Sequence, residues 1–267
     1  MRVPREMSKV RYAQDMRFAT PLHTSRRRHA LSSRTLTVSA ALGWLTLGGI
    51  AVFAIVQLSG LNQGSLLGGF LMSLGRTSVA YVIALVASIV IALSITANPI
   101  VERILLPIFD VLQSFPSFAL FPILVNSLQR SPELVILVVL ALEIIWPILF
   151  SIIGGMKNRR EELEEAATIF GARGWRRIWV FTLPELLPSI VTGSIVGWGE
   201  GWEVIIGAEL LVSVHQGIGR YFGILGNSGQ STLLAAGIGV LMILLFLINK
   251  LIWLPLLHDV SAYETET

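Results

Sequence analysis

The chain has 267 residues, of which 54% are hydrophobic and only 14% are charged, with a formal net charge of +3 and no cysteine. A soluble domain carries about 25% charged residues, so this composition excludes an ordinary globular surface and favours a protein embedded in a lipid bilayer. The lack of cysteine excludes disulfide frameworks, thiolate zinc sites and cysteine nucleophiles.

Residues 1–35 form a strongly basic segment, with nine Lys or Arg residues against only Glu6 and Asp15. A basic arm beside a membrane domain is typical of the cytoplasmic side, where it meets anionic lipid. Nucleic-acid binding would need aromatic residues interleaved on a folded module, and the arm has few of them, so we expect no nucleic-acid partner. We interpret residues 1–35 as a flexible cytoplasmic arm.

Six apolar stretches reach the length of about 20 helical residues that crosses a hydrocarbon core. The third contains Pro107, Pro116 and Pro122, which predicts a kinked or broken helix. We expect an all-α polytopic membrane domain over residues 36–258, followed by an acidic tail at 259–267. The expected spans lie near residues 36–58, 66–95, 104–128, 133–155, 186–214 and 233–257.

The distribution of Lys and Arg predicts how the spans are oriented. With the N-terminus inside and six crossings, seventeen of the twenty lie in inside segments: nine in the arm, six in one long charged loop, Arg103 and Lys250. Arg130 and Arg220 lie outside, and Arg76 lies within the second span. Both termini and the charged loop are therefore expected to face the cytoplasm.

The charged loop at 157–184 carries acids in its first half and bases in its second, which predicts two short helices that meet at Gly171. Glu165, Ala166 and Ala167 are followed after three residues by Gly171. Nine further residues lead to Phe181, and Leu183 and Pro184 close the pattern. We expect glycine here because a turn is needed that a Cβ would obstruct.

This spacing resembles the EAA loop of permease subunits of binding-protein-dependent ABC importers, except that Phe181 replaces the usual Ile. Three further stretches are similar to the nitrate, sulfonate and taurine type of these permeases: Leu112–Pro116, Gly199–Glu209 and Gly217–Gly219. The resemblance implies the type I permease fold in a prokaryotic inner membrane, and a small solute of the nitrate, sulfonate, taurine or bicarbonate class.

The resemblance also implies partners: a second permease, two ATP-binding-cassette ATPase subunits and an extracytoplasmic solute-binding protein. In such a complex the loop transmits motion from the ATPase, with Glu165 pairing with a donor there and Ala166 and Ala167 allowing close approach. Leu183 and Pro184 would restart the chain as the fifth span. No Gly-x4-Gly-Lys-Ser/Thr phosphate loop occurs in the sequence. We therefore expect a non-catalytic chain that binds no cofactor or metal, with ATP and Mg²⁺ on the partner.

Carboxylates within the spans are candidates for the solute pathway, because a charge in a membrane helix normally faces a cavity, a partner or the aqueous rim. Glu200 and Glu203 are three residues apart and share a helix face, whereas Glu209 points elsewhere. We expect Glu200, Trp202 and Glu203 to line the pathway or its gate, and Glu209 to belong to the outer gate.

Other candidate pathway residues are Asp110, Gln113 and Glu143. The alternative is that each acid makes an interhelical hydrogen bond or salt bridge, for instance with Arg76 or Gln113. Carboxylates repel an anionic solute unless they are protonated or paired, so the acids leave the charge of the solute open. Glycines recur every fourth residue at 193, 197 and 201, a spacing that favours close packing of membrane helices.

Two other functions fit the sequence. A proton-coupled secondary transporter or channel would use the intramembrane acids without any ATPase. A membrane scaffold would use the charged loop to dock another protein without transport.

Overall fold

The computed structural model describes residues 66–265, apart from 129–130, 159–168, 170 and 213. All of them belong to the second of two compact units, which begins at Ala41. The predictions for the basic arm and the first span therefore lie outside the described residues. Within the described part every element is helical and no strand occurs, so the all-α prediction is confirmed.

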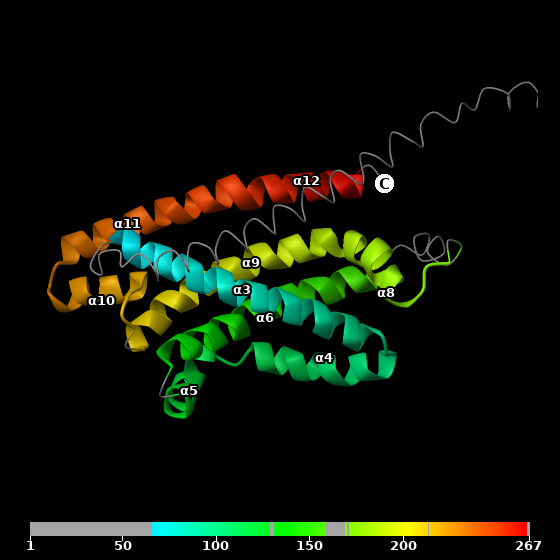
Figure 1. The fold of residues 1–267 in the computed structure, drawn as a ribbon, viewed down its shortest axis with the longest axis horizontal. Coiled ribbons are helices and arrows are strands. Elements are labelled where there is room, and N and C mark those ends of the chain that lie inside the picture. The colour runs from blue at the N-terminus through cyan, green and yellow to red at the C-terminus, as the bar shows by residue number, and fades with distance from the viewer. Residues whose placement is uncertain (1–65, 129–130, 159–168, 170, 213, 266–267) are drawn as a thin grey trace, which may run out of the picture. The chain divides into compact units, whose positions relative to one another are not determined.

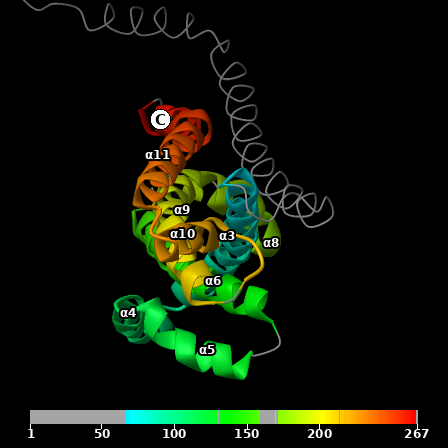
Figure 2. The same ribbon diagram turned by 90° about the vertical axis from the view of Figure 1, so that its left-hand side faces the viewer.

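Three long helices pack side by side and form the centre of this unit: α3 (Leu66–Thr96), α6 (Pro132–Lys157) and α9 (Leu183–Leu211) (Figure 1). Their contact surfaces are apolar and nearly closed to solvent, with Ala80, Ile144 and Ile205 fully buried. Helix α11 (Ser231–Ile248) lies along one side, and the short helix α10 (Ile218–Asn227) closes one end (Figure 2).

Four described helices are long and apolar enough to cross a membrane: 66–96, 132–157, 174–211 and 231–260. They correspond to the second, fourth, fifth and sixth predicted spans. The third is divided into α4 (Pro99–Gln113) and a second piece made of η1 (Ser117–Leu120) and α5 (Phe121–Ser127), bent by 83°. The prediction of a broken helix is thus confirmed.

The break in the third span follows from its prolines. Pro116 precedes η1 with an extended backbone, and Pro122 stands in the first turn of α5. Because proline lacks an amide donor and crowds the preceding turn, both positions suit helix starts rather than helix interiors. Pro107, in contrast, lies inside α4, which continues past it to Gln113.

The glycine repeat brings α9 against α6. A Cβ at Gly193 would approach the Cα of Ile148 to 2.8 Å, and a Cβ at Gly197 would approach the carbonyl oxygen of Ile144 to 2.9 Å. Two backbones thus meet where ordinary side chains would hold them apart. The predicted packing role of this repeat is confirmed, and its partner is a helix of the same chain.

An aromatic cluster attaches the C-terminal helices to the centre. The chain continues from α11 through the π-helical turn η3 (Asn249–Trp253) into α12 (Leu254–Thr265), whose backbone includes most of the predicted acidic tail. Trp253 is 1% exposed, and its ring centroid lies 6.0 Å from those of Tyr81 on α3 and Trp198 on α9. The Tyr81 hydroxyl donates to Ser194 Oγ at 3.0 Å.

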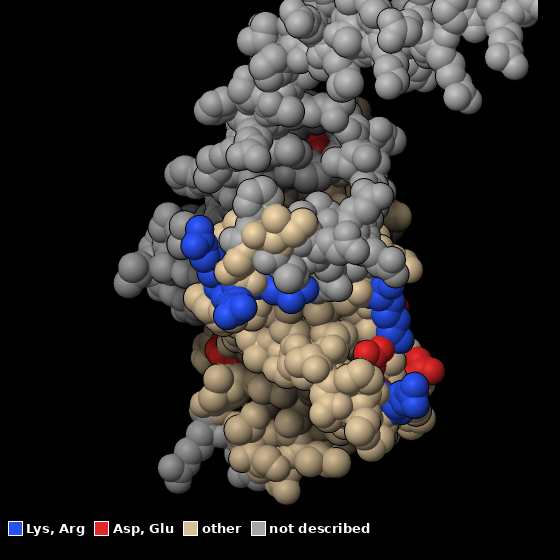
Figure 3. All heavy atoms as spheres, turned by 90° about the vertical axis from the view of Figure 1, so that its right-hand side faces the viewer, with Lys and Arg blue, Asp and Glu red and all other residues tan. Residues whose placement is uncertain are grey.

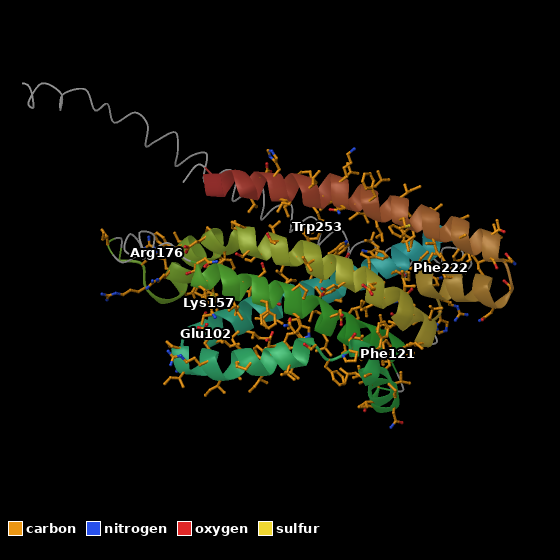
Figure 4. All side chains as sticks on the ribbon, turned by 180° about the vertical axis from the view of Figure 1, so that it is seen from behind. Glu102, Phe121, Lys157, Arg176, Phe222 and Trp253 are labelled. Atoms are coloured by element: carbon orange, nitrogen blue, oxygen red, sulfur yellow. The ribbon has the colours of Figure 1, made fainter. Side chains whose placement is uncertain are left out.

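The described unit has two distinct ends. Glu102, Lys157 and Arg176 lie together at the end that carries α8 (Gly174–Arg177), which we call the α8 end (Figure 4). Phe121 and Phe222 lie toward the opposite end, which carries α10 and which we call the α10 end. The two ends differ in whether their charged side chains are buried or exposed.

Candidate functional site

A buried ionic junction occupies the α10 end. Arg76 lies in the interior of α3, and its side chain is only 1% exposed. Its Nη1 donates to Glu209 Oε1 of α9 and to the carbonyl oxygen of Gln216, both at 2.6 Å. Its Nε and Nη2 donate to the two carboxylate oxygens of Glu133 on α6, at 2.6 and 2.7 Å. One guanidinium therefore connects three long helices and the segment that leads into α10.

Glu209 is the buried carboxylate of this junction. It accepts a hydrogen bond from Ser73 Oγ at 2.8 Å and one from the backbone amide of Gly219 at 2.9 Å, besides that from Arg76. Ser73 Oγ in turn accepts from the amide of Ile218 at 2.9 Å. A buried charge is stable only when it is paired and hydrogen-bonded, and here each requirement is met. The first turn of α10 is thereby held against α3 and α9.

The close approach of α10 requires glycine at several positions. A Cβ at Gly217 would collide with the Glu209 carboxylate, and a Cβ at Gly219 would collide with the carbonyl oxygen of Ile206. A Cβ at Gly69 on α3 would lie 2.9 Å from the carbonyl oxygen of Gly217. The Gly-Ile-Gly sequence noted at 217–219 therefore has a physical reason: the Gly219 amide reaches the Glu209 carboxylate and the Ile218 amide reaches Ser73, an approach that side chains at 217 and 219 would exclude.

The two acids of the junction differ in exposure. The Glu209 side chain is fully buried, whereas that of Glu133 is 40% exposed. Removing one partner of a buried ion pair costs about 3–5 kcal/mol, because the other charge stays buried and unpaired. The Glu133 carboxylate, in contrast, can be rehydrated when it leaves Arg76, because its side chain already reaches solvent. Glu209 is thus the fixed partner of Arg76, and Glu133 is the separable one.

The sequence had left two possibilities for Glu209, a place in the outer gate or a salt bridge with Arg76. The structure shows the salt bridge, and the gate role stays a prediction. Glu133 and Ser73 were missed as members of this site. Glu133 reads as an ordinary acid in the first turn of a helix, and a serine in an apolar span gives no signal. The lone arginine in a membrane helix was the available clue, since such a charge demands partners.

Three candidate pathway acids lie near one another in the middle of the unit. Glu200 interacts electrostatically with Glu203, on the same helix, and with Glu143 on α6. Glu203 is exposed, and the other two are half-buried. The side chain of Trp202 points away from these acids. It is 3% exposed and stacks on Phe70 of α3 inside the packed core, with 5.5 Å between the ring centroids. The structure brings the three acids together and separates them from Trp202.

The broken third span runs beside these acids. Near the end of α4, Phe109 contacts Trp146 of α6, with 5.8 Å between ring centroids. After the break, the ring of Phe118 lies where a Cβ of Gly207 on α9 would be, 2.7 Å away. The other predicted residues here are exposed and joined to each other: Gln113 Nε2 donates to Asp110 Oδ1 at 2.6 Å.

The charged loop is described only in its second half, so Glu165, Ala166 and Ala167 lie outside the described residues. Gly171 adopts a left-handed conformation with φ +65°, and a Cβ there would meet nothing within 4 Å. The turn that a Cβ would obstruct is thus present, and the obstruction is local: in the left-handed conformation a Cβ would crowd the residue's own backbone and not a neighbouring element.

The second predicted helix of the loop does not end before the fifth span. The backbone passes from α8 through the π-helical turn η2 (Ile178–Thr182) directly into α9, so Gly174–Leu211 is one continuous helix. Leu183 donates its amide to the carbonyl of Ile178, five residues earlier. Leu183 and Pro184 therefore do not restart the chain. The π-helical turn accommodates Pro184 because it places the missing amide where the hydrogen-bond ladder is already shifted.

Basic side chains gather on the face of the α8 end (Figure 3), where aromatic rings are also exposed. Arg173 and Arg176 are exposed, and the rings of Trp175 and Trp179 are 71% and 57% exposed while contacting each other. Beside them, Lys157 Nζ forms a salt bridge of 2.9 Å with Glu102. Exposed Trp rings next to cations at the end of a helix are typical of membrane interfaces and of contact surfaces.

The fold and these sites define a multi-pass helical membrane protein with a buried ionic junction at one end and an exposed basic and aromatic surface at the other. A family described as the binding-protein-dependent transport system inner membrane component matches residues 84–253, and the chain belongs to this family. The matched region contains the broken third span, the charged loop, the acids of α9 and the whole of α10.

Individual relatives agree with this placement. The taurine transport system permease protein TauC of Escherichia coli is 30% identical over 66% of this chain and 64% of its own length. The nitrate import permease protein NrtB of Leptolyngbya laminosa is 29% identical over 73% and 68%. The bicarbonate transport system permease protein CmpB of Synechocystis sp. is 28% identical over 64% and 61%. The chain thus spans slightly less than two thirds of the taurine and bicarbonate relatives.

Proposed function

We propose that this chain is the permease subunit of an ATP-driven ABC importer. With a second permease, identical or related, it would form the pathway for a small solute that an extracytoplasmic binding protein delivers. Two partner ATPase subunits would bind ATP and Mg²⁺, and this chain would carry no cofactor and no catalytic group. The names of the relatives support a solute of the taurine, nitrate or bicarbonate class.

The observation that carries the proposal is the continuous helix from Gly174 to Leu211. It begins three residues after the left-handed turn at Gly171, passes the acids Glu200 and Glu203, and reaches the junction at Glu209. A displacement imposed on the loop by an ATPase is therefore transmitted along one rigid element to both candidate regions. The exposed residues of the α8 end supply a surface for such a partner.

The excess of basic residues in the arm and the charged loop supports a cytoplasmic α8 end and extracytoplasmic α10 end. In that orientation the ATPase would bind beside Gly171, and the binding protein would approach α10. The exposed acids and the broken third span would lie between them, where Asp110, Gln113 and Glu143 remain candidate pathway residues. Discontinuous helices commonly mark transport sites in membrane proteins.

The test is ATP-dependent solute uptake by proteoliposomes that contain the chain with its ATPase partners. Gly171→Asp is expected to abolish uptake while leaving the protein in the membrane, because an aspartate side chain in the left-handed turn strains the loop and adds charge to the ATPase contact. A bulky residue at Ala167 is expected to do the same. Gly199→Ala is the matched control, since a Cβ at Gly199 meets nothing within 4 Å.

Normal uptake by both loop variants would refute the proposal. Uptake driven by a proton gradient without any ATPase would instead favour the secondary transporter, with Glu200→Gln and Glu203→Gln as the damaging changes. Unchanged uptake after deletion of the chain would favour the scaffold.

A further inference from the structure

We propose that the guanidinium of Arg76 is an oxyanion-binding site at the α10 end, and that Glu133 occupies it in the resting protein. The inference rests on the proposed function for the solute class and on the geometry of the junction for the site. Nitrate, bicarbonate and the sulfonate of taurine each present two oxygens on one face, as a carboxylate does. A guanidinium binds such a face through two parallel hydrogen bonds.

The hydrogen-bonding geometry of Arg76 separates a fixed side from an exchangeable side. Nη1 is committed to the buried Glu209 and to a backbone carbonyl. Nε and Nη2 point together at Glu133, at 2.6 and 2.7 Å, which is the pair of donors that a free oxyanion would use. Among the described partners of Arg76, the Glu133 carboxylate is the one whose side chain reaches solvent, and it therefore stands in for an anion on this side of the guanidinium.

Exchange leaves the number of negative charges in contact with Arg76 unchanged. With either Glu133 or a monovalent oxyanion bound, Arg76 faces two of them, one of which is always Glu209, and the released Glu133 carries its own charge into water. The released Glu133 remains in the first turn of α6, where the helix dipole favours a negative charge. Its side chain is already 40% exposed, so it enters water without leaving an apolar site. The exchange thus replaces one ion pair with an equivalent one.

Few other described cations compete for this role. Arg220 is the other cation of the described α10 end, and its Nη1 is bound to the carbonyl oxygen of Val214. Arg103, Lys157, Arg173 and Arg176 lie on elements that meet at the α8 end. An oxyanion arriving at the α10 end therefore meets Arg76 as the buried, preorganised cation.

The experiment measures anion binding to the full-length protein in nanodiscs of neutral lipid. The thermal unfolding midpoint is followed as sodium nitrate or sodium methanesulfonate replaces sodium chloride at constant ionic strength, which yields an apparent Kd. Glu133→Ala removes the competing carboxylate and is expected to lower the apparent Kd for both oxyanions about fivefold. Glu133→Gln, which retains the size of the side chain, is expected to act in the same direction and serves if the alanine variant does not fold.

Glu102→Ala is the matched control, because it also removes a glutamate from an ion pair, but at the α8 end. It is expected to leave the apparent Kd unchanged. A double variant that adds Arg220→Ala to Glu133→Ala is expected to bind the oxyanions as tightly as Glu133→Ala alone. The proposal is overturned if both Glu133 variants bind the oxyanions no more tightly than Glu102→Ala, or if Arg220→Ala abolishes the tighter binding of the Glu133→Ala variant.

The binding measurement needs neither ATP nor transport. A fivefold gain together with no ATP-dependent uptake would refute the importer function and leave the anion site intact. ATP-dependent uptake by the protein, with no tighter oxyanion binding in the Glu133 variants, would support the importer function and refute the anion site.

Discussion

The two ends of the described unit each hold a glutamate paired with a base, but one pair is buried and the other is partly exposed. At the α10 end, Glu209 and Arg76 are both buried and are joined by further hydrogen bonds from Ser73 and Gly219. At the α8 end, Glu102 and Lys157 form a single contact, with side chains 21% and 52% exposed. The same ionic chemistry therefore fixes one end and leaves the other adaptable.

This difference indicates which end of the unit tolerates substitution of its charged residues. The junction is built from backbone amides, glycines and fully paired charges, so each member depends on the others. The α8 end presents long side chains to solvent, and these can rearrange when a partner binds. Four substitutions measure the contrast, in order of decreasing effect on the free energy of unfolding.

Glu209→Ala is expected to have the largest effect, a loss of about 3–5 kcal/mol, because Arg76 stays buried with only its bonds to Glu133 and Gln216. Denaturation in detergent micelles, followed by tryptophan fluorescence, measures the loss. If Glu209→Ala proves as stable as Glu102→Ala, the junction does not hold the α10 end together.

Gly219→Ala is expected to have the second-largest effect, a loss of stability in the upper half of a range of about 1–3 kcal/mol. The added methyl group would meet the backbone of Ile206, which cannot yield without moving α9. Gly239→Ala in α11 is the control, since nothing lies within 4 Å of its Cβ and alanine favours helix. Equal stability of the two variants in the same assay would contradict the close packing of α10.

Gly197→Ala tests the packing at the centre of the bundle. Its Cβ would stand 2.9 Å from the carbonyl oxygen of Ile144. The expected loss of stability is in the lower half of a range of about 1–3 kcal/mol. Gly199→Ala, two residues along the same helix, has open space and is expected to be neutral or stabilising. A thermal unfolding scan of both proteins gives the comparison, and the reverse order would exclude α6 as the partner of the glycine repeat.

Glu102→Ala is expected to have the smallest effect, less than about 1 kcal/mol, since Lys157 keeps access to water. The same denaturation assay as for Glu209→Ala gives the number, and a double-mutant cycle with Lys157→Ala isolates the pair. A cost as large as that of Glu209→Ala would show that the α8 end is as rigid as the α10 end.

Much of the fold was predictable from local chemistry. Prolines at 116 and 122 indicated the break in the third span, and the glycine repeat on α9 indicated close helix packing. The helix α10 was not predicted, because ten residues of mixed polarity between two spans resemble a loop. The π-helical turn after α8 was also hidden, since it depends on how Pro184 fits an existing helix and not on a distinctive residue pattern.

The candidate site was predictable only in part. A lone arginine and several acids within spans required partners, and the pairing of Arg76 with Glu209 was one of the alternatives. The sequence did not indicate that Glu133 supplies the second carboxylate, since the two glutamates are 76 positions apart and only the fold brings them to one guanidinium. Nor did it show that the indole of Trp202 turns away from Glu200 and Glu203.

The π-helical turn at 178–182 has a consequence for how the loop and the membrane helix can evolve together. One residue advances an α-helix by about 100°, and a π-helical turn absorbs the equivalent of one extra residue without ending the helix. The angular phase between α8 and α9 is therefore set by this turn alone. Loss or gain of a single residue there would redirect the face that carries Trp175 and Arg176 while Gly193, Gly197 and the junction keep their contacts. A docking surface can thus be re-aimed toward a different partner without repacking the bundle.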